Sequence, residues 1–161
     1  MTLTRILVTC IALSVPAALL SQGAEIAFGG LSQDTGLPVE VGADKLEIDQ
    51  ADGAATFTGN VEISQGEMVL TAGRARVIYG ADGAITEMQA SEGVTLVNGG
   101  EAAEAAEAVY SIEAGTVVMT GDVILTQGSN ALSSQRLVID LARGTGTLEG
   151  RVRTIFQPGA Q

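Results

Sequence analysis

The sequence lacks the residues on which most enzymes and metal sites depend. Its 161 residues include no histidine, no tryptophan and a single cysteine, Cys10. Without histidine, the usual zinc sites and the Ser/His and Cys/His nucleophilic pairs are excluded. A hydrolase built on paired carboxylates stays open as an alternative. Asp44, Asp49, Asp52 and Asp82 lie near turns but lack the spacing of a calcium loop. We predict no catalytic residue, no metal site and no cofactor.

Positive charge is also scarce, because 8 basic residues face 19 acidic ones. Nucleic acid is therefore not an expected partner, since phosphate binding needs a basic surface. The charge is unevenly placed. Residues 25–52 carry seven acids and one lysine, whereas the chain from Arg143 onward has three arginines and one glutamate. This pattern fits either an ordinary solvated surface or complementary ends that steer molecules into a chain.

The longest apolar run lies at the start of the chain. Arg5 precedes a mainly apolar, uncharged run of 15 residues, Ile6 to Leu20, and small residues follow. This pattern is typical of a secretory signal peptide, and the run is shorter than the roughly 20 residues that span a membrane. We predict that residues 1–24 are a signal peptide that is removed, with a retained anchor as the alternative. Cleavage fits after any of three residues, Ser21, Gly23 or Ala24.

A pattern used twice dominates the rest of the chain. The segment FTGNVEISQG at 57–66 reappears as MTGDVILTQG at 119–128, an offset of 62 residues. Leu70 and Val77 match Leu132 and Ile139 at the same offset. Such a repeat indicates an array of similar units and a long binding surface, not a cage around one active site.

The repeated segments alternate apolar and polar residues, as strands with one buried face do. Asp-Gly and Asn-Gly pairs separate these runs and suit hairpin turns. Glycines inside the arms are expected to bend them, as at sheet corners; they are Gly59, Gly73, Gly93, Gly121 and Gly150. The sequence thus predicts many short strands wrapped into an open roll or sandwich over 39–156, after a flexible lead-in at 25–38 and before a tail at 157–161.

Two local features are less clear from the pattern. The alanine- and glutamate-rich segment 101–108 favours helix by propensity but has no large apolar stripe. We expect mainly strand over 104–112, with a helical turn near Glu101 as the alternative. Both parities are apolar at 117–118 and 124–125, so alternation does not decide which side chains point inward.

The ordered motifs resemble a known family. Ala43-Asp44-x-Leu46-x-Ile48, the two repeated segments, and Leu137-x-Ile139-Asp140-Leu141 are similar to the OstA-like domain over roughly 39–156. Within that family the chain is most similar to the LptA group, periplasmic bridges of lipopolysaccharide transport. The resemblance implies an all-β, open antiparallel β-jellyroll of about sixteen short strands. It also implies a periplasmic location, stacking of rolls end to end, and lipid A acyl chains that travel along an apolar interior.

The resemblance further implies partners and candidate residues. The expected partners are lipopolysaccharide, an LptC-like inner-membrane protein, an LptD-like outer-membrane protein, and other copies of the chain stacked head to tail. Edge strands that pair with protein partners are expected at Val39, Val41, Arg151, Val152, Arg153, Ile155 and Phe156. The candidates for lipid contact are Ile48, Phe57, Val61, Ile63, Met68, Leu70, Val77, Leu96, Met119, Val123, Leu125, Leu132, Leu137 and Ile139.

Other functions stay open on the sequence alone. If the N-terminal segment is retained, an LptC-like member fits the pattern. A structural β array that assembles with itself, without lipid, also fits. The carboxylate hydrolase is the third alternative.

Overall fold

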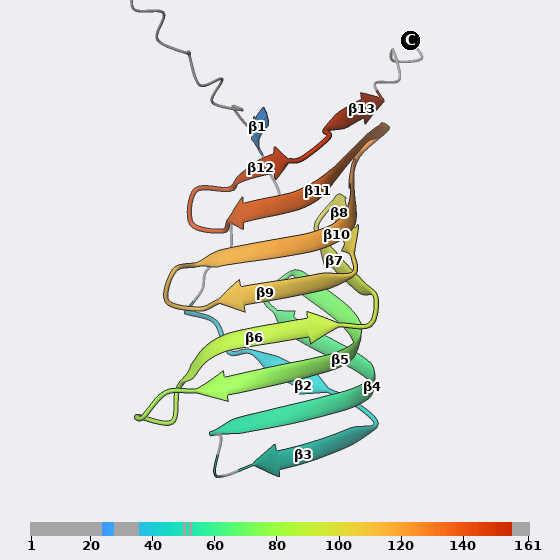
Figure 1. Ribbon diagram of the computed structural model, residues 1–161. Helices are drawn as coiled ribbons and strands as arrows, with labels where there is room; N and C mark the ends of the chain where they lie inside the picture. The colour runs from blue at the N-terminus through green and yellow to red at the C-terminus, as the bar shows by residue number, and fades with distance from the viewer. Residues whose placement is uncertain (1–23, 28–35, 50, 52, 156–161) are drawn as a thin grey trace, which may run out of the picture.

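A computed structural model gives the fold, and it describes residues 24–27, 36–49, 51 and 53–155. Thirteen β-strands form one continuous antiparallel sheet in these residues (Figure 1). None of the described residues belongs to a helix that is long and apolar enough to cross a membrane. The strands are β1 (Ala24–Ala27), β2 (Glu40–Gly42), β3 (Lys45–Asp49), β4 (Ala54–Gln65), β5 (Met68–Tyr79), β6 (Ile85–Ser91), β7 (Val94–Asn98), β8 (Glu101–Ala105), β9 (Glu107–Ser111), β10 (Thr116–Gln127), β11 (Asn130–Asp140), β12 (Thr145–Glu149) and β13 (Arg153–Ile155).

The sheet folds into two facing walls because its four long strands bend. Each of β4, β5, β10 and β11 pairs with different neighbours on the two sides of its bend. The first wall holds β3, β6, β9, β12 and β1 with one half of each long strand. The second wall holds β2, β7, β8 and β13 with the other halves. The predicted all-β antiparallel jellyroll is confirmed.

Glycines form the bends, as the sequence predicts. Gly59 and Gly121, equivalent in the repeat, have φ angles of 82° and 87°. A Cβ at Gly59 would lie 2.6 Å from the Asp44 carboxyl oxygen, and one at Gly121 would lie 2.6 Å from the Ala106 Cβ. Both the positive φ and the close approach of a residue between two neighbouring strands therefore require glycine at these corners.

The repeat is visible in the hydrogen bonds as well as in the sequence. The carbonyl oxygen of Gly53 accepts a bond from the Tyr79 N–H at 3.1 Å, and that of Gly115 accepts one from the Leu141 N–H at 2.9 Å. These two bonds lie 62 residues apart, the offset of the sequence repeat. Each repeat therefore builds the same pair of bent hairpin arms.

The described residues form thirteen strands where the sequence predicts about sixteen, because the long arms stay continuous through their bends. The strand predicted at 104–112 is confirmed over the alternative of a helical turn near Glu101, since 101–105 and 107–111 are strands whose alternate alanines pack inward. At the start of the described residues, β1 pairs with β12 from Ala24↔Leu148 to Ala27↔Thr145.

Candidate functional site

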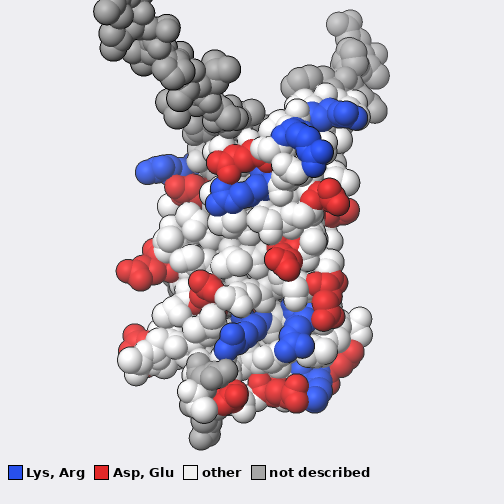
Figure 2. Space-filling view, in the orientation of Figure 1, with Lys and Arg blue, Asp and Glu red and all other residues white. Residues whose placement is uncertain are grey.

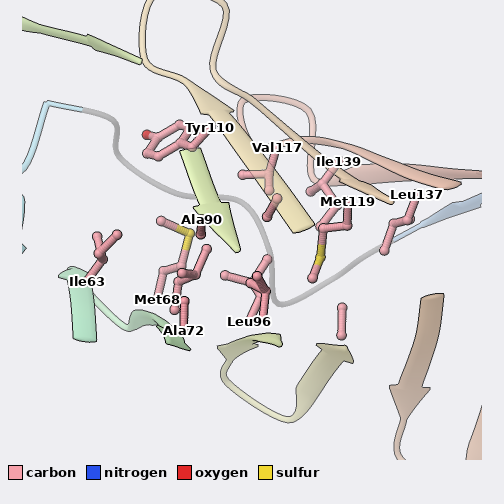
Figure 3. Close-up of a cluster of buried hydrophobic side chains, with 14 of the residues drawn as sticks. Ile63, Met68, Ala72, Ala90, Leu96, Tyr110, Val117, Met119, Leu137 and Ile139 are labelled. Carbon is pink, nitrogen blue, oxygen red and sulfur yellow. The ribbon is translucent and has the colours of Figure 1, made fainter. Parts of the chain in front are cut away.

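The interior between the two walls is a continuous apolar cluster. Side chains from both walls point toward one another there, such as Met68 and Leu96 from one side and Val117 and Met119 from the other (Figure 3). Val117, Met119 and Leu125 are 0% exposed. Burial also settles the facing of the doubly apolar pairs, since Val117 and Leu125 point inward and Ile124 is 45% exposed.

Most of the predicted lipid-contact residues lie in this cluster, and two lie outside its buried part. Phe57 packs partly buried against the cluster, and Ile48 is 70% exposed on β3. Ile48 is exposed because β3 pairs only with β4 among the described residues. The other twelve are buried: Val61, Ile63, Met68, Leu70, Val77, Leu96, Met119, Val123, Leu125, Leu132, Leu137 and Ile139. Burial shows that these twelve side chains pack in the core. Contact with lipid stays a prediction for all fourteen residues.

The interior is filled by the chain's own side chains near its middle. The space bounded by Leu96, Ala103 and Leu125, next to Glu101, is too small for a water molecule. Any acyl chain that enters here must therefore push the walls apart, because a packed interior has no spare volume.

One hydrogen bond joins the two walls along the edge opposite the glycine corners. The Tyr110 hydroxyl of β9 donates to Gln65 Oε1 of β4 at 2.9 Å, and both residues are buried. Gln65 Nε2 donates in turn to the Leu37 carbonyl oxygen at 2.9 Å, which ties the segment before β2 to this edge. Burial raises the pKa of the Tyr110 hydroxyl, so it stays a donor at neutral pH. The bond closes the interior at this point.

A row of polar side chains follows the same edge of the second wall. The register places Gln65 beside Met68, Met68 beside Asn98, Asn98 beside Glu101, and Glu101 beside Gln127. We call Gln65, Asn98, Glu101 and Gln127 the polar lip. Two-residue turns that begin with a glycine of positive φ hold these strand ends in place. Sequence alternation could have found this row, because each member has the inward parity of its strand.

The hydrogen bonds of the polar lip are incomplete. Gln127 Nε2 donates to Glu101 Oε1 at 2.6 Å. Glu101 Oε2 and Asn98 Nδ2 are buried without a partner, on residues that are 8% and 2% exposed. Buried polar atoms are nearly always hydrogen-bonded in proteins, so these two need an explanation.

The two ends of the roll present edge strands. At one end β3 exposes Leu46 (50%) and Ile48, while Val41 on β2 and Val39 just before it are half-buried. A salt bridge of 2.9 Å joins Lys45 to Glu47 on β3 and holds the pKa of the Glu47 carboxyl below its usual value.

At the other end, β13 pairs with β11 and exposes Ile155 (60%), while Val152 is 38% exposed. Of the predicted edge at 151–156, Arg153 to Ile155 form β13, Arg151 and Val152 precede the strand, and Phe156 lies outside the described residues. In the first wall the outermost strand is β1, which the sequence does not predict.

On the visible face the basic side chains gather in two groups, and acidic side chains are spread between and around them (Figure 2). One basic group lies near the β11–β13 end. The other lines a surface hollow of about 320 Å³ on the outside of the first wall, where Arg74 and Arg76 face Gln89 and Glu107. Among the residues that the structure describes, no group of three or more Cys, His, Asp and Glu side chains could hold a metal ion. The arrangement as a whole suits binding between walls and pairing at edges.

Comparison with known proteins identifies the family. The sequence model described as "LptA/(LptD N-terminal domain) LPS transport protein" matches residues 40–145, well over half of the chain. The chain belongs to this family. The predicted OstA-like resemblance is thereby confirmed.

Two relatives extend the comparison. An uncharacterized protein of Rhizobium meliloti (strain 1021) is 30% identical over 156 residues, which cover 89% of this chain and 84% of that protein. The crystal structure of LptH from Pseudomonas aeruginosa matches with a TM-score of 0.70 at 19% identity. The match covers 78% of this chain and 99% of that one. LptH is described as the LptA-homologous periplasmic component of the lipopolysaccharide transport device. At this identity the likeness concerns the fold.

Proposed function

We propose that the chain is a periplasmic bridge protein that carries lipopolysaccharide from the inner to the outer membrane through stacked jellyrolls. The observation that carries this proposal is the apolar interior, which runs between two walls and ends at edge strands with exposed apolar side chains. Family membership adds the ligand class, since the family is one of lipopolysaccharide transport.

The interior supplies the lipid-binding part of the proposal. Acyl chains would lie among the fourteen predicted contact residues, where aliphatic side chains replace water around them. Ile48 and Phe57 fit this role best at the β3 end, because they are apolar and not fully enclosed. In the closed interior the same side chains pack against one another until the walls separate.

The edges supply the partner-binding part. An unpaired edge strand is normally an aggregation hazard, and strand addition converts it into a docking surface. Val39 and Val41 would meet an LptC-like protein or another copy, and the segment 151–156 would meet an LptD-like protein or another copy. The acidic start and the basic end favour head-to-tail order.

Native purification followed by mass spectrometry tests the ligand. We expect lipopolysaccharide to copurify with the folded protein. The tight packing around Leu96 and Leu125 favours the second candidate, a self-assembling β array that needs no lipid. Repeated absence of lipopolysaccharide from folded, assembled protein would support that array and contradict the bridge.

Photo-crosslinking in cells tests the partners. Crosslinkers at Val41 and at Val152 should capture two different members of the family. A crosslinker at Val97, which is 40% exposed on the outside of β7, serves as the control and should capture neither. Capture from both ends of one and the same protein, other than the chain itself, would count against directional stacking.

A further inference from the structure

The polar lip contains two buried atoms without hydrogen-bond partners, Asn98 Nδ2 and Glu101 Oε2. They belong to residues that are direct cross-strand partners, Asn98 of β7 and Glu101 of β8, on either side of the turn at 99–100. One atom is a donor and the other is an acceptor. Each such orphan destabilises the fold unless a partner satisfies it at another stage.

Their position limits where a partner would come from. On the inner side, the space between Leu96, Ala103 and Leu125 has no room for water. Asn98 and Glu101 flank the turn that ends their hairpin, so the open side of the two walls lies beyond them. An occupant would therefore reach them at the boundary between the apolar interior and the solvent.

The neighbouring hydrogen bond fixes the carboxylate in place. Gln127 Nε2 donates to Glu101 Oε1 at 2.6 Å, which orients the side chain and leaves Oε2 with its lone pairs unused. The Tyr110 to Gln65 bond lies in the same row, two strands away from Asn98. The row thus combines a closed contact between the walls with an unfilled polar position.

The chemistry of the two atoms selects the ligand group. A hydroxyl or a secondary amide can accept from Asn98 Nδ2 and donate to Glu101 Oε2 at the same time. A phosphate group would meet the like charge of the carboxylate, and an acyl chain offers no polar atom. The pair is therefore matched to neutral groups that both donate and accept.

We propose that the polar lip binds hydroxyl or amide groups in the head of a glycolipid whose acyl chains occupy the interior. This inference rests on the proposed function and adds a polar position to it. The lip holds the head at the opening, and the apolar cluster holds the chains. Asn98 Nδ2 and Glu101 Oε2, which lack hydrogen-bond partners in the closed form, then bind the ligand when lipid is present.

Binding measurements on two variants test the proposal. Asn98→Leu removes the orphan donor with little change in shape, and Glu101→Gln turns the orphan acceptor into a donor. Glu104→Gln makes the same change at an exposed position of β8 and is the matched control. Each protein is titrated with purified lipopolysaccharide and with myristate, which has an acyl chain but no hydroxyl or amide group.

We expect both lip variants to bind lipopolysaccharide about 2- to 12-fold more weakly, the effect of one net hydrogen bond. Myristate binding should stay within about twofold of wild type, since its head cannot use the pair. The control should match wild type for both ligands. The melting temperature of Asn98→Leu without ligand should equal or exceed that of wild type, because the substitution removes an unsatisfied group.

Three results would overturn the inference. If both lip variants bind lipopolysaccharide as wild type does, head-group binding by the polar lip is contradicted and the proposed function still stands. Equal losses for lipopolysaccharide and myristate would indicate a general effect on the interior instead of a head-group contact. A wild-type protein that folds and binds no lipopolysaccharide would contradict the proposed function itself, and the lip with it.

Discussion

The hydrogen bond between the walls makes a prediction about how the interior opens. Tyr110→Phe removes the hydroxyl that donates to Gln65 Oε1 and leaves the ring in place. Because both residues are buried, the acceptor does not gain a compensating bond to water. The substitution should therefore weaken the closed form, and it should do so at the edge where the walls must part.

The size of the effect follows from the worth of one buried bond. A net loss of about 1 kcal/mol is expected for a neutral hydrogen bond. For an ordered region of this size that loss corresponds to a fall in melting temperature of about 4 °C. If the bond exists only in the closed form, the same 1 kcal/mol raises the population of the open form about fivefold.

Two measurements on the same variant check the reasoning. Calorimetry gives the melting temperature, and stopped-flow mixing with lipopolysaccharide gives the rate of loading, which should rise up to about fivefold. Tyr79→Phe is the matched control, because Tyr79 lies 39% exposed at the end of β5. Lower stability with an unchanged loading rate would refute the idea that lipid enters by separation of the walls at this bond.

Three further predictions concern the corners, the interior and alkaline pH. Gly121→Ala should destabilise the fold by about 1–3 kcal/mol more than Gly93→Ala. Both glycines have a positive φ, but only a Cβ at 121 meets a neighbour, the Ala106 Cβ at 2.6 Å. Equal losses of stability in denaturant unfolding would show that this close contact is unimportant. Phe57→Asp should lower copurifying lipid several-fold while the protein stays folded, because the side chain is only partly buried; unchanged lipid would exclude Phe57 from the path. Burial raises the pKa of Tyr110 above 10.0, so the stability that it confers is full below about pH 10 and declines as the pH rises through the folded-state pKa; Tyr110→Phe should lack that part of the decline.

Much of the wall architecture was predictable from the sequence, because strand alternation and glycine corners are local signals. The segment at 57–66 predicts a strand that bends at Gly59, and the structure bends β4 there. Because of the repeat, the sequence also predicts a bend at Gly121. At 101–108, helix propensity competed with the needs of the sheet, and pairing with β7 and β10 prevailed.

The remaining features depend on contacts that are distant in sequence. β1 pairs with β12 across more than a hundred residues, and its four residues carry no turn or alternation signal that points to that partner. The hydrogen bond between the walls is similar, since Gln65 and Tyr110 meet only after the two walls fold against each other. Sequence alternation indicates which side chains of each strand point inward. It does not indicate which edge of one wall faces which edge of the other.

The two repeats share one architecture and differ in how completely they close. In the second repeat Met119, Leu125 and Leu137 are 0% exposed. In the first, the roll ends at β3, where Leu46 and Ile48 are half exposed or more and Phe57 is only partly covered. At this end, separating the walls would bring the smallest amount of additional apolar surface into water, because part of that surface is already exposed. The β3 end should therefore open first, and the docking of a second roll onto this edge would cover the same side chains that the opening exposes.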